Sequence, residues 1–99
     1  MTDDDTKLRR EVQRGADAQA LLDNPLLSEA LEAFEKEITD QWKKSPLRDV
    51  EGREKLRLLL EASAKFSAYL LTTANTGKLA VESIRQKRSV AQRVSDWMA

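Results

Sequence analysis

Two prolines, Pro25 and Pro46, constrain the fold of this chain more than any other feature of its sequence. Asn24 is a preferred N-cap residue, and proline fits the first helical position because its missing N–H would have no helical partner there. The residue before a proline avoids the α region, so Ser45 should end a helix. Between the two prolines, apolar residues recur at steps of three or four. The spacing therefore predicts a helix from Pro25 to about Ser45.

A second long helix is expected after a very short connection. Asp49 offers its N-cap, and helical spacing continues to Asn75-Thr76-Gly77, which is typical of a helix that stops at a glycine. In the alternative, residues from Leu79 onward continue this helix and tolerate the glycine at a cost of ~1 kcal/mol. Because only residues 45–48 connect the two helices, they should form an antiparallel hairpin. Its predicted apolar seam consists of Leu27, Leu31, Phe34, Ile38, Trp42, Leu56, Leu59, Leu60, Phe66 and Leu70.

The segments on either side of the hairpin also have helical spacing. A short helix is predicted from about Thr6 to Asp23, with Asp3 to Asp5 complementing its N-terminus and Gly15 weakening its apolar stripe. Residues 78–99 predict a basic amphipathic helix. With three Gly, two Pro and one Tyr in 99 residues, the composition indicates an all-α chain. The predicted organisation is an acidic lead with a short helix (1–24), a hairpin core (25–77) and a basic helix (78–99).

The composition excludes several kinds of chemistry. Without His or Cys, the chain has no imidazole base, no thiolate nucleophile and no zinc site of the usual type. No apolar run approaches the ~18–20 residues that cross a bilayer, and the acidic opening has the wrong sign for a signal peptide. We therefore expect a cytoplasmic protein with no membrane partner, no cofactor, no metal and no small-molecule substrate. We do not expect an enzyme.

The remaining polar side chains suggest surface and packing roles. Acidic residues of the first long helix fall on its outer face, whereas acid–base catalysis would need a desolvated carboxyl with a raised pKa. Ser63 and Ser67 have no activating base, which a nucleophile needs. Close packing of two helices explains these small residues better. Asn75-Thr76-Gly77-Lys78 lacks the first glycine and the hydroxyl residue of a phosphate-binding loop.

Basic residues gather in the last predicted helix. The charges are unevenly divided, with eight basic and eleven acidic side chains in residues 1–48 and nine basic and six acidic ones in residues 49–99. Phosphate contacts need only positive charge and reach, and Arg9, Arg10 and Arg14 also qualify. The alternative is a solvated or protein-docking face, since the net charge is zero. The candidate residues for contact with DNA or with a protein partner are Lys78, Arg85, Lys87, Arg88 and Arg93.

Trp97 is large for a position two residues from the end of the sequence. Tryptophan is prominent among residues that anchor protein interfaces, which favours a role as a partner anchor. Packing inside the chain is the alternative. The narrow seam of the hairpin further predicts a homo-oligomer or a permanent partner, because two-helix hairpins of this size are poorly stabilised alone.

Three stretches resemble small helical proteins encoded in the head and packaging gene clusters of tailed bacteriophages and prophages. They are Arg14–Ala30, Trp42–Leu56 without residues 47–48, and Thr76–Ala80. Within that group, the architecture is similar to the oligomerisation core of a terminase small subunit. In that family, antiparallel hairpins pack into a ring that brings viral DNA to the large, ATP-hydrolysing subunit. Many members carry an N-terminal helix-turn-helix, and the single short helix here is too little for one.

Two functions remain open from the sequence. The resemblance implies a non-enzymatic packaging adaptor that oligomerises through its hairpin and contacts phage DNA or the motor subunit through its basic helix. The alternative is a small interaction protein, such as a minor virion component or a host-factor inhibitor, that docks on a protein and binds no DNA. Salt separates them, because phosphate contacts weaken steeply with rising salt concentration and an apolar complex does not.

Overall fold

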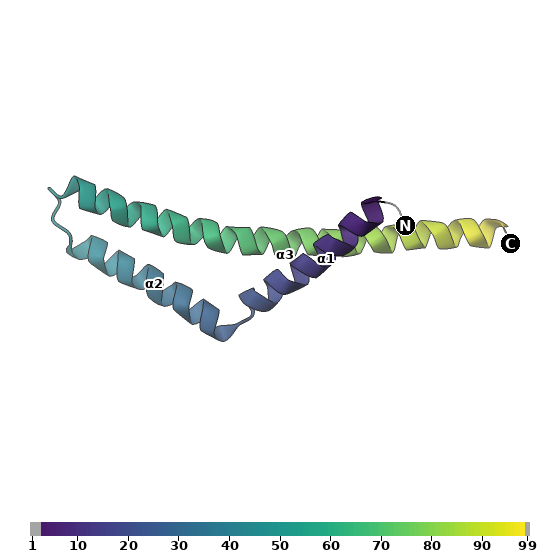
Figure 1. Cartoon of the computed structure of the whole chain (residues 1–99), viewed down its shortest axis with the longest axis horizontal. Coiled ribbons are helices and arrows are strands. Elements are labelled where there is room, and N and C mark those ends of the chain that lie inside the picture. Colours follow the sequence, from purple (N-terminus) through teal and green to yellow (C-terminus); the bar gives the residue numbers. More distant parts are fainter. Residues whose placement is uncertain (1–2, 99) are drawn as a thin grey trace. The chain divides into compact units, whose positions relative to one another are not determined.

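The computed structural model describes residues 3–98 and contains three helices. These are α1 (Asp3–Leu22), α2 (Pro25–Lys44) and α3 (Val50–Met98), and the described residues include no strand (Figure 1). The predicted all-α fold is therefore confirmed. The described residues form two compact units. One unit holds residues 21–70, and the other holds residues 3–20 together with 71–98.

Helix α2 begins and ends where the prolines predict. The Asn24 side-chain oxygen accepts hydrogen bonds from the main-chain N–H groups of Leu26 (2.9 Å) and Leu27 (3.4 Å). These bonds satisfy two of the N–H groups that a helix N-terminus leaves without partners. At the other end, Ser45 is extended (ψ 141°), and its N–H and hydroxyl both donate to the Trp42 carbonyl.

Arg53 closes the hairpin of residues 21–70. Its Nη1 donates to the Trp42 carbonyl (3.2 Å), the Ser45 carbonyl (3.3 Å) and the Ser45 hydroxyl (2.9 Å). The guanidinium also lies 4.2 Å from the centroid of the Trp42 ring. A cation is favourable here, because the last carbonyls of α2 carry partial negative charge. Asp49 caps α3 as predicted, accepting from the Gly52 N–H at 3.1 Å.

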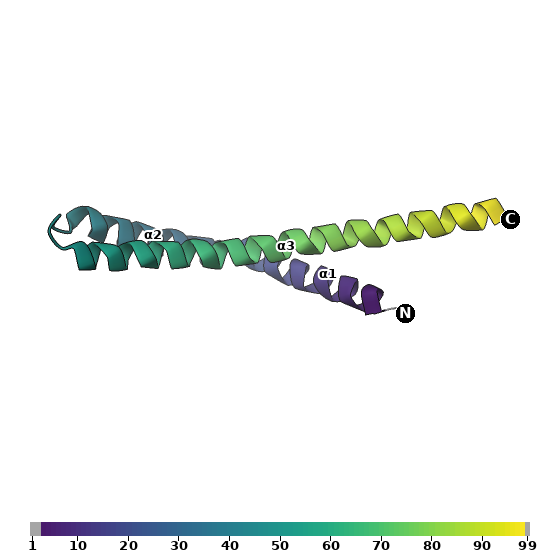
Figure 2. The ribbon, with the colours of Figure 1, turned by 90° about the horizontal axis from the view of Figure 1, so that it is seen from above.

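The pairing of residues shows that α2 and the first half of α3 are antiparallel. The Trp42 ring contacts the Arg53 guanidinium, and Glu35 accepts a 3.4 Å hydrogen bond from the Ser63 hydroxyl. Residues earlier in α2 therefore contact residues later in α3. Figures 1 and 2 show the two helices running in opposite directions on either side of the short connection.

The seam of this hairpin is only partly buried. Ile38, Leu70 and Ser63 are buried, whereas four other predicted seam residues, Leu27, Leu31, Leu56 and Leu60, are half-buried. The three aromatic residues of the seam and one leucine are exposed: Trp42 (41%), Phe34 (43%), Leu59 (46%) and Phe66 (53%).

In the second unit, α1 packs against the second half of α3 through two glycines. Helix α1 runs antiparallel to α3 (Figures 1 and 2), with Gly15 against Gly77. A Cβ built on Gly15 would lie 2.5 Å from the Gly77 Cα, and one built on Gly77 would lie 2.6 Å from the Gly15 Cα. Small buried residues continue the contact surface on both helices: Ala18, Ala74 and Ala80.

The predicted helix end at Asn75-Thr76-Gly77 is wrong. Helix α3 continues through these residues to Met98, as the alternative proposed, and Gly77 does not adopt the positive φ of a glycine helix stop. Gly77 serves a tertiary contact and not a helix end. Its missing side chain lets the backbone of α1 approach α3 closely. Gly15 likewise lies at a backbone contact between α1 and α3, where a Cβ would meet the Gly77 main chain.

We predict that Gly77→Ala destabilises the fold. In an exposed helix interior this change stabilises by about 1 kcal/mol, but here the new methyl group would meet main-chain atoms of α1. We expect a loss of roughly 1–3 kcal/mol, the usual cost of overpacking. Urea unfolding followed by circular dichroism measures it, with Asn75→Ala as the exposed control on α3. Equal stabilisation of both variants would contradict the glycine contact.

We also predict that Arg53→Met weakens the closed end of the hairpin. Methionine keeps much of the aliphatic length but removes the donor of three hydrogen bonds and the cation over Trp42. The expected cost is about 1–2 kcal/mol of unfolding free energy. Lys55→Met removes an exposed cation two residues further along α3 and is the matched control. The same urea midpoint for both variants would show that these contacts stabilise nothing.

Candidate nucleic-acid interface

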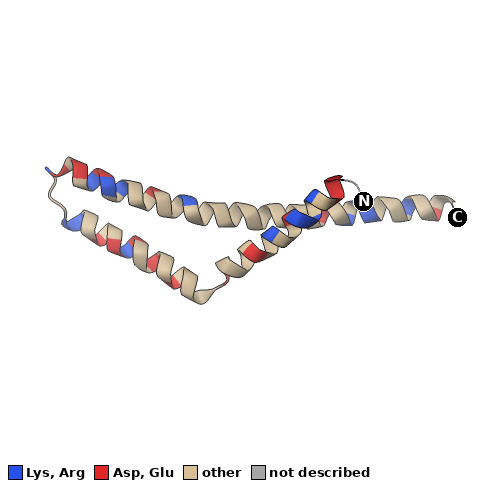
Figure 3. Ribbon diagram, in the orientation of Figure 1, with Lys and Arg blue, Asp and Glu red and all other residues tan. Residues whose placement is uncertain are grey.

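The last fourteen described residues of α3 are exposed at every position. From Arg85 to Met98 no side chain is buried or half-buried. This stretch carries four basic side chains and one acidic one, Asp96. Local pairs support the helix, including Gln92 to Asp96 (3.0 Å) and Arg85 to Glu82 (3.0 Å). Figure 3 shows the contrast with the uncharged stretch of α3 between Lys65 and Lys78.

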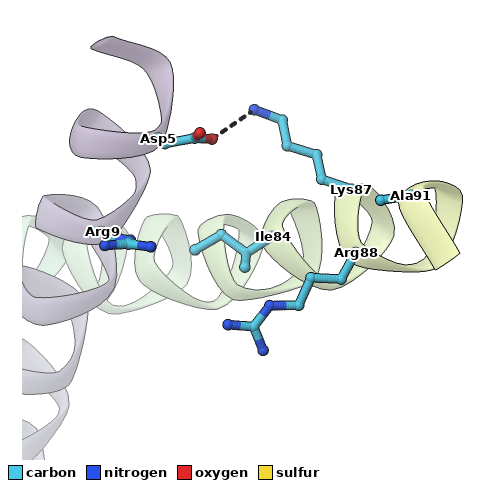
Figure 4. A pocket seen from close by; sticks show the side chains of 6 residues that line it. All are labelled: Asp5, Arg9, Ile84, Lys87, Arg88 and Ala91. Atoms are coloured by element: carbon cyan, nitrogen blue, oxygen red, sulfur yellow. Dashed lines mark hydrogen bonds and ion pairs between the residues drawn. The ribbon is translucent and has the colours of Figure 1, made fainter. Parts of the chain in front are cut away.

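The structure places four of the five predicted basic residues on two surfaces. Lys87 and Arg88 line a cleft of about 480 Å³ between α1 and α3, here called the α1–α3 cleft. Its six lining residues are Asp5, Arg9, Ile84, Lys87, Arg88 and Ala91 (Figure 4). Arg85 and Arg93 line a separate hollow on α3. Lys78 lines neither of these two surfaces.

The α1–α3 cleft joins charges that are distant in the sequence. Lys87 Nζ lies 3.4 Å from Asp5 Oδ1, and the two side chains are 54% and 40% exposed. In Figure 4, Ile84 lies between Arg9, which comes from α1, and Arg88. Three cations thus share the cleft with one carboxylate, which leaves an excess of positive charge.

The sequence named every cation of this cleft but did not predict that they meet. From the sequence, Arg9 is a general phosphate-binding candidate together with Arg10 and Arg14, and Asp5 complements the N-terminus of its helix. The signal that would have joined them is the pair of glycines. If Gly15 faces Gly77 in an antiparallel pair, ten residues back on α1 places Asp5 opposite Lys87, as the structure shows.

The other surface cations and Trp97 are also accessible. Arg85 pairs with Glu82 at 3.0 Å, and Arg93 donates to the Ser89 hydroxyl at 3.4 Å. Both are contacts between residues of one exposed helix, which cost little to break. Trp97 is 87% exposed, so the alternative of packing inside the chain is not observed.

Two exposed carboxylates, Asp40 and Glu54, pair with neighbouring cations of their own helices. Lys36 donates a 2.8 Å hydrogen bond to Asp40 and holds the pKa of that carboxyl below its ordinary value. Arg57 does the same for the pKa of Glu54. A general acid at neutral pH needs a shift in the opposite direction. Residues 3–98 contain no cluster of carboxylates that could hold a metal ion.

Two further sequence features have structural explanations. Asn75-Thr76-Gly77-Lys78 lies inside α3 and not in a loop, so its N–H groups are not arranged to cradle a phosphate. Among the described residues, no helix combines the length and apolar character needed to span a bilayer. Comparison of the chain with protein-family models, curated proteins and solved structures gives no match.

Proposed function

We propose that this chain is a non-enzymatic assembly protein of the phage type, acting as a DNA-packaging adaptor similar to a terminase small subunit. It oligomerises through its helical hairpin and contacts DNA or the packaging motor through the basic end of α3, in the bacterial host cytoplasm. The observation that carries the proposal is the exposed stretch from Arg85 to Met98, with its four basic residues. These cations cover no core, so they are accessible to a partner.

The net charges of the two units support DNA contact by the α1–α3 unit and not by residues 21–70. The described residues of the α1–α3 unit carry nine basic and seven acidic side chains, whereas residues 21–70 carry eight and ten. A polyanion is therefore attracted to the first unit and repelled by the second. Such contacts to phosphates do not depend on the base sequence.

Exposed apolar residues support the oligomer. None of the larger side chains in residues 3–98 is fully buried, and seventeen large apolar side chains are exposed. Leu59, Phe66 and Tyr69 follow each other at helical spacing on α3, where 46%, 53% and 62% of their surfaces are exposed. Apolar side chains repeated along one face of a helix indicate a protein contact more often than a solvated surface.

A second candidate function is docking on a protein partner without DNA. It is favoured by Val90, Val94 and Trp97, which are exposed at the i, i+4 and i+7 positions of α3 (56%, 50% and 87%). This is the spacing with which an amphipathic helix enters an apolar groove. In this function the flanking cations steer the helix to an acidic rim and touch no phosphate.

We predict that replacing Arg85, Lys87, Arg88 and Arg93 by Ala strongly weakens DNA binding at low salt. Four lost phosphate contacts should lower the slope of log affinity against log salt by about 3–4. Fluorescence anisotropy of a labelled DNA duplex measures both quantities. The control replaces Lys43, Lys44, Arg48 and Lys55 by Ala, which changes the net charge equally but in residues 21–70.

Equal weakening by both variants would show that net charge, and not this helix, attracts DNA. A wild-type chain that binds no duplex at low salt would contradict the packaging adaptor and favour the protein-docking function. Circular dichroism of each variant establishes that its helices are intact.

A further inference from the structure

We propose that the α1–α3 cleft is a binding site for one phosphate of a duplex nucleic-acid backbone, held jointly by Arg9, Lys87 and Arg88. This inference rests on the proposed contact with DNA and adds a residue of α1 to it. It also assigns a role to Asp5, whose carboxylate occupies Lys87 until a phosphate replaces it.

The charges of the cleft favour an anion. Three cations and one carboxylate line about 480 Å³, so positive charge is in excess where two helices meet. Bringing like charges together costs energy that a bound anion recovers. Arginine suits this role, because its planar fork can donate two parallel hydrogen bonds to phosphate oxygens.

The geometry leaves room for exchange between the carboxylate and a phosphate. The 3.4 Å separation of Lys87 Nζ and Asp5 Oδ1 is long for a charge-assisted hydrogen bond, which is normally ~2.7–2.9 Å. Both side chains are about half exposed, and such ion pairs contribute little stability. A phosphate oxygen can therefore take the place of the carboxylate at Lys87 with little loss to the fold.

The apolar part of the cleft suits a phosphate that is attached to sugars. Ile84 lies between Arg9 and Arg88, and Ala91 lies about two turns beyond Ile84 along α3 (Figure 4). A free phosphate gains nothing from these side chains, whereas a deoxyribose can pack against them.

The second basic surface is separate from the cleft. Arg85 and Arg93 line their own hollow on the same turns of α3 as the cleft. At about 100° per residue, the residues of this hollow lie on the face of α3 opposite to the cleft. A phosphate bound in the cleft is therefore not shared with Arg85 or Arg93.

The test is a double-mutant cycle on the full chain with a short labelled DNA duplex of mixed sequence, measured by anisotropy at several salt concentrations. Arg9→Gln and Arg88→Gln should each weaken binding several-fold. Together they should weaken it by less than the product of the single effects, because both side chains hold one phosphate. Arg9→Gln combined with Arg93→Gln is the matched control, and its effects should multiply. Asp5→Asn should strengthen binding, since no carboxylate then competes for Lys87.

The outcomes separate this inference from the proposed function. If the wild-type chain binds the duplex but Arg9→Gln binds it equally well, the cleft proposal is overturned and the packaging adaptor is not. Multiplying effects for Arg9 with Arg88, as for Arg9 with Arg93, would also overturn the shared phosphate site. If the wild-type chain binds no duplex, both proposals fail, even if anionic phosphatidylserine vesicles bind in an Arg9-dependent manner.

Discussion

The backbone contact between Gly15 and Gly77 sets the register of α1 on α3 and, with it, the charges that meet further along. Neither residue has a side chain, so the two helices approach more closely than any other pair of residues would allow. In an antiparallel pair, every step from Gly15 towards the start of α1 matches a step from Gly77 towards Met98. Asp5 therefore reaches Lys87, and Arg9 joins Arg88 at one cleft. A residue with a larger side chain at either glycine would separate the two halves of this site.

Local signals in the sequence predicted the hairpin, because its ends depend on neighbouring residues. Asn24 caps the helix that Pro25 begins, Ser45 precedes a proline, and Asp49 caps α3. Gly77 was misassigned because a glycine at a helix end and a glycine at a helix crossing look alike without the partner helix. The same limit applies to the candidate site. Its five basic residues could be named from charge, but the cleft that brings Lys87 and Arg88 together with Arg9 depends on where α1 lies.

The distribution of apolar residues connects the fold to the proposed function. The buried positions are small or few, and large side chains such as Phe66 and Trp97 remain on the surface. Few large apolar side chains are thus buried within the chain, and many are exposed on its surface. Such exposed apolar surface is typical of a protein that binds other subunits. Residues 21–70 hold the exposed aromatic face of the hairpin, and the basic end of α3 lies in the other unit. Assembly and DNA contact can therefore operate on different parts of one chain.

The most direct test of this account is the solution mass of the wild-type chain by light scattering at low and high salt. The account predicts a salt-stable multiple of the 11.2 kDa chain mass, because apolar contacts between hairpins do not weaken as salt rises. An 11.2 kDa species at every concentration and salt level would contradict it. The chain would then be a monomer whose exposed apolar face serves a different protein.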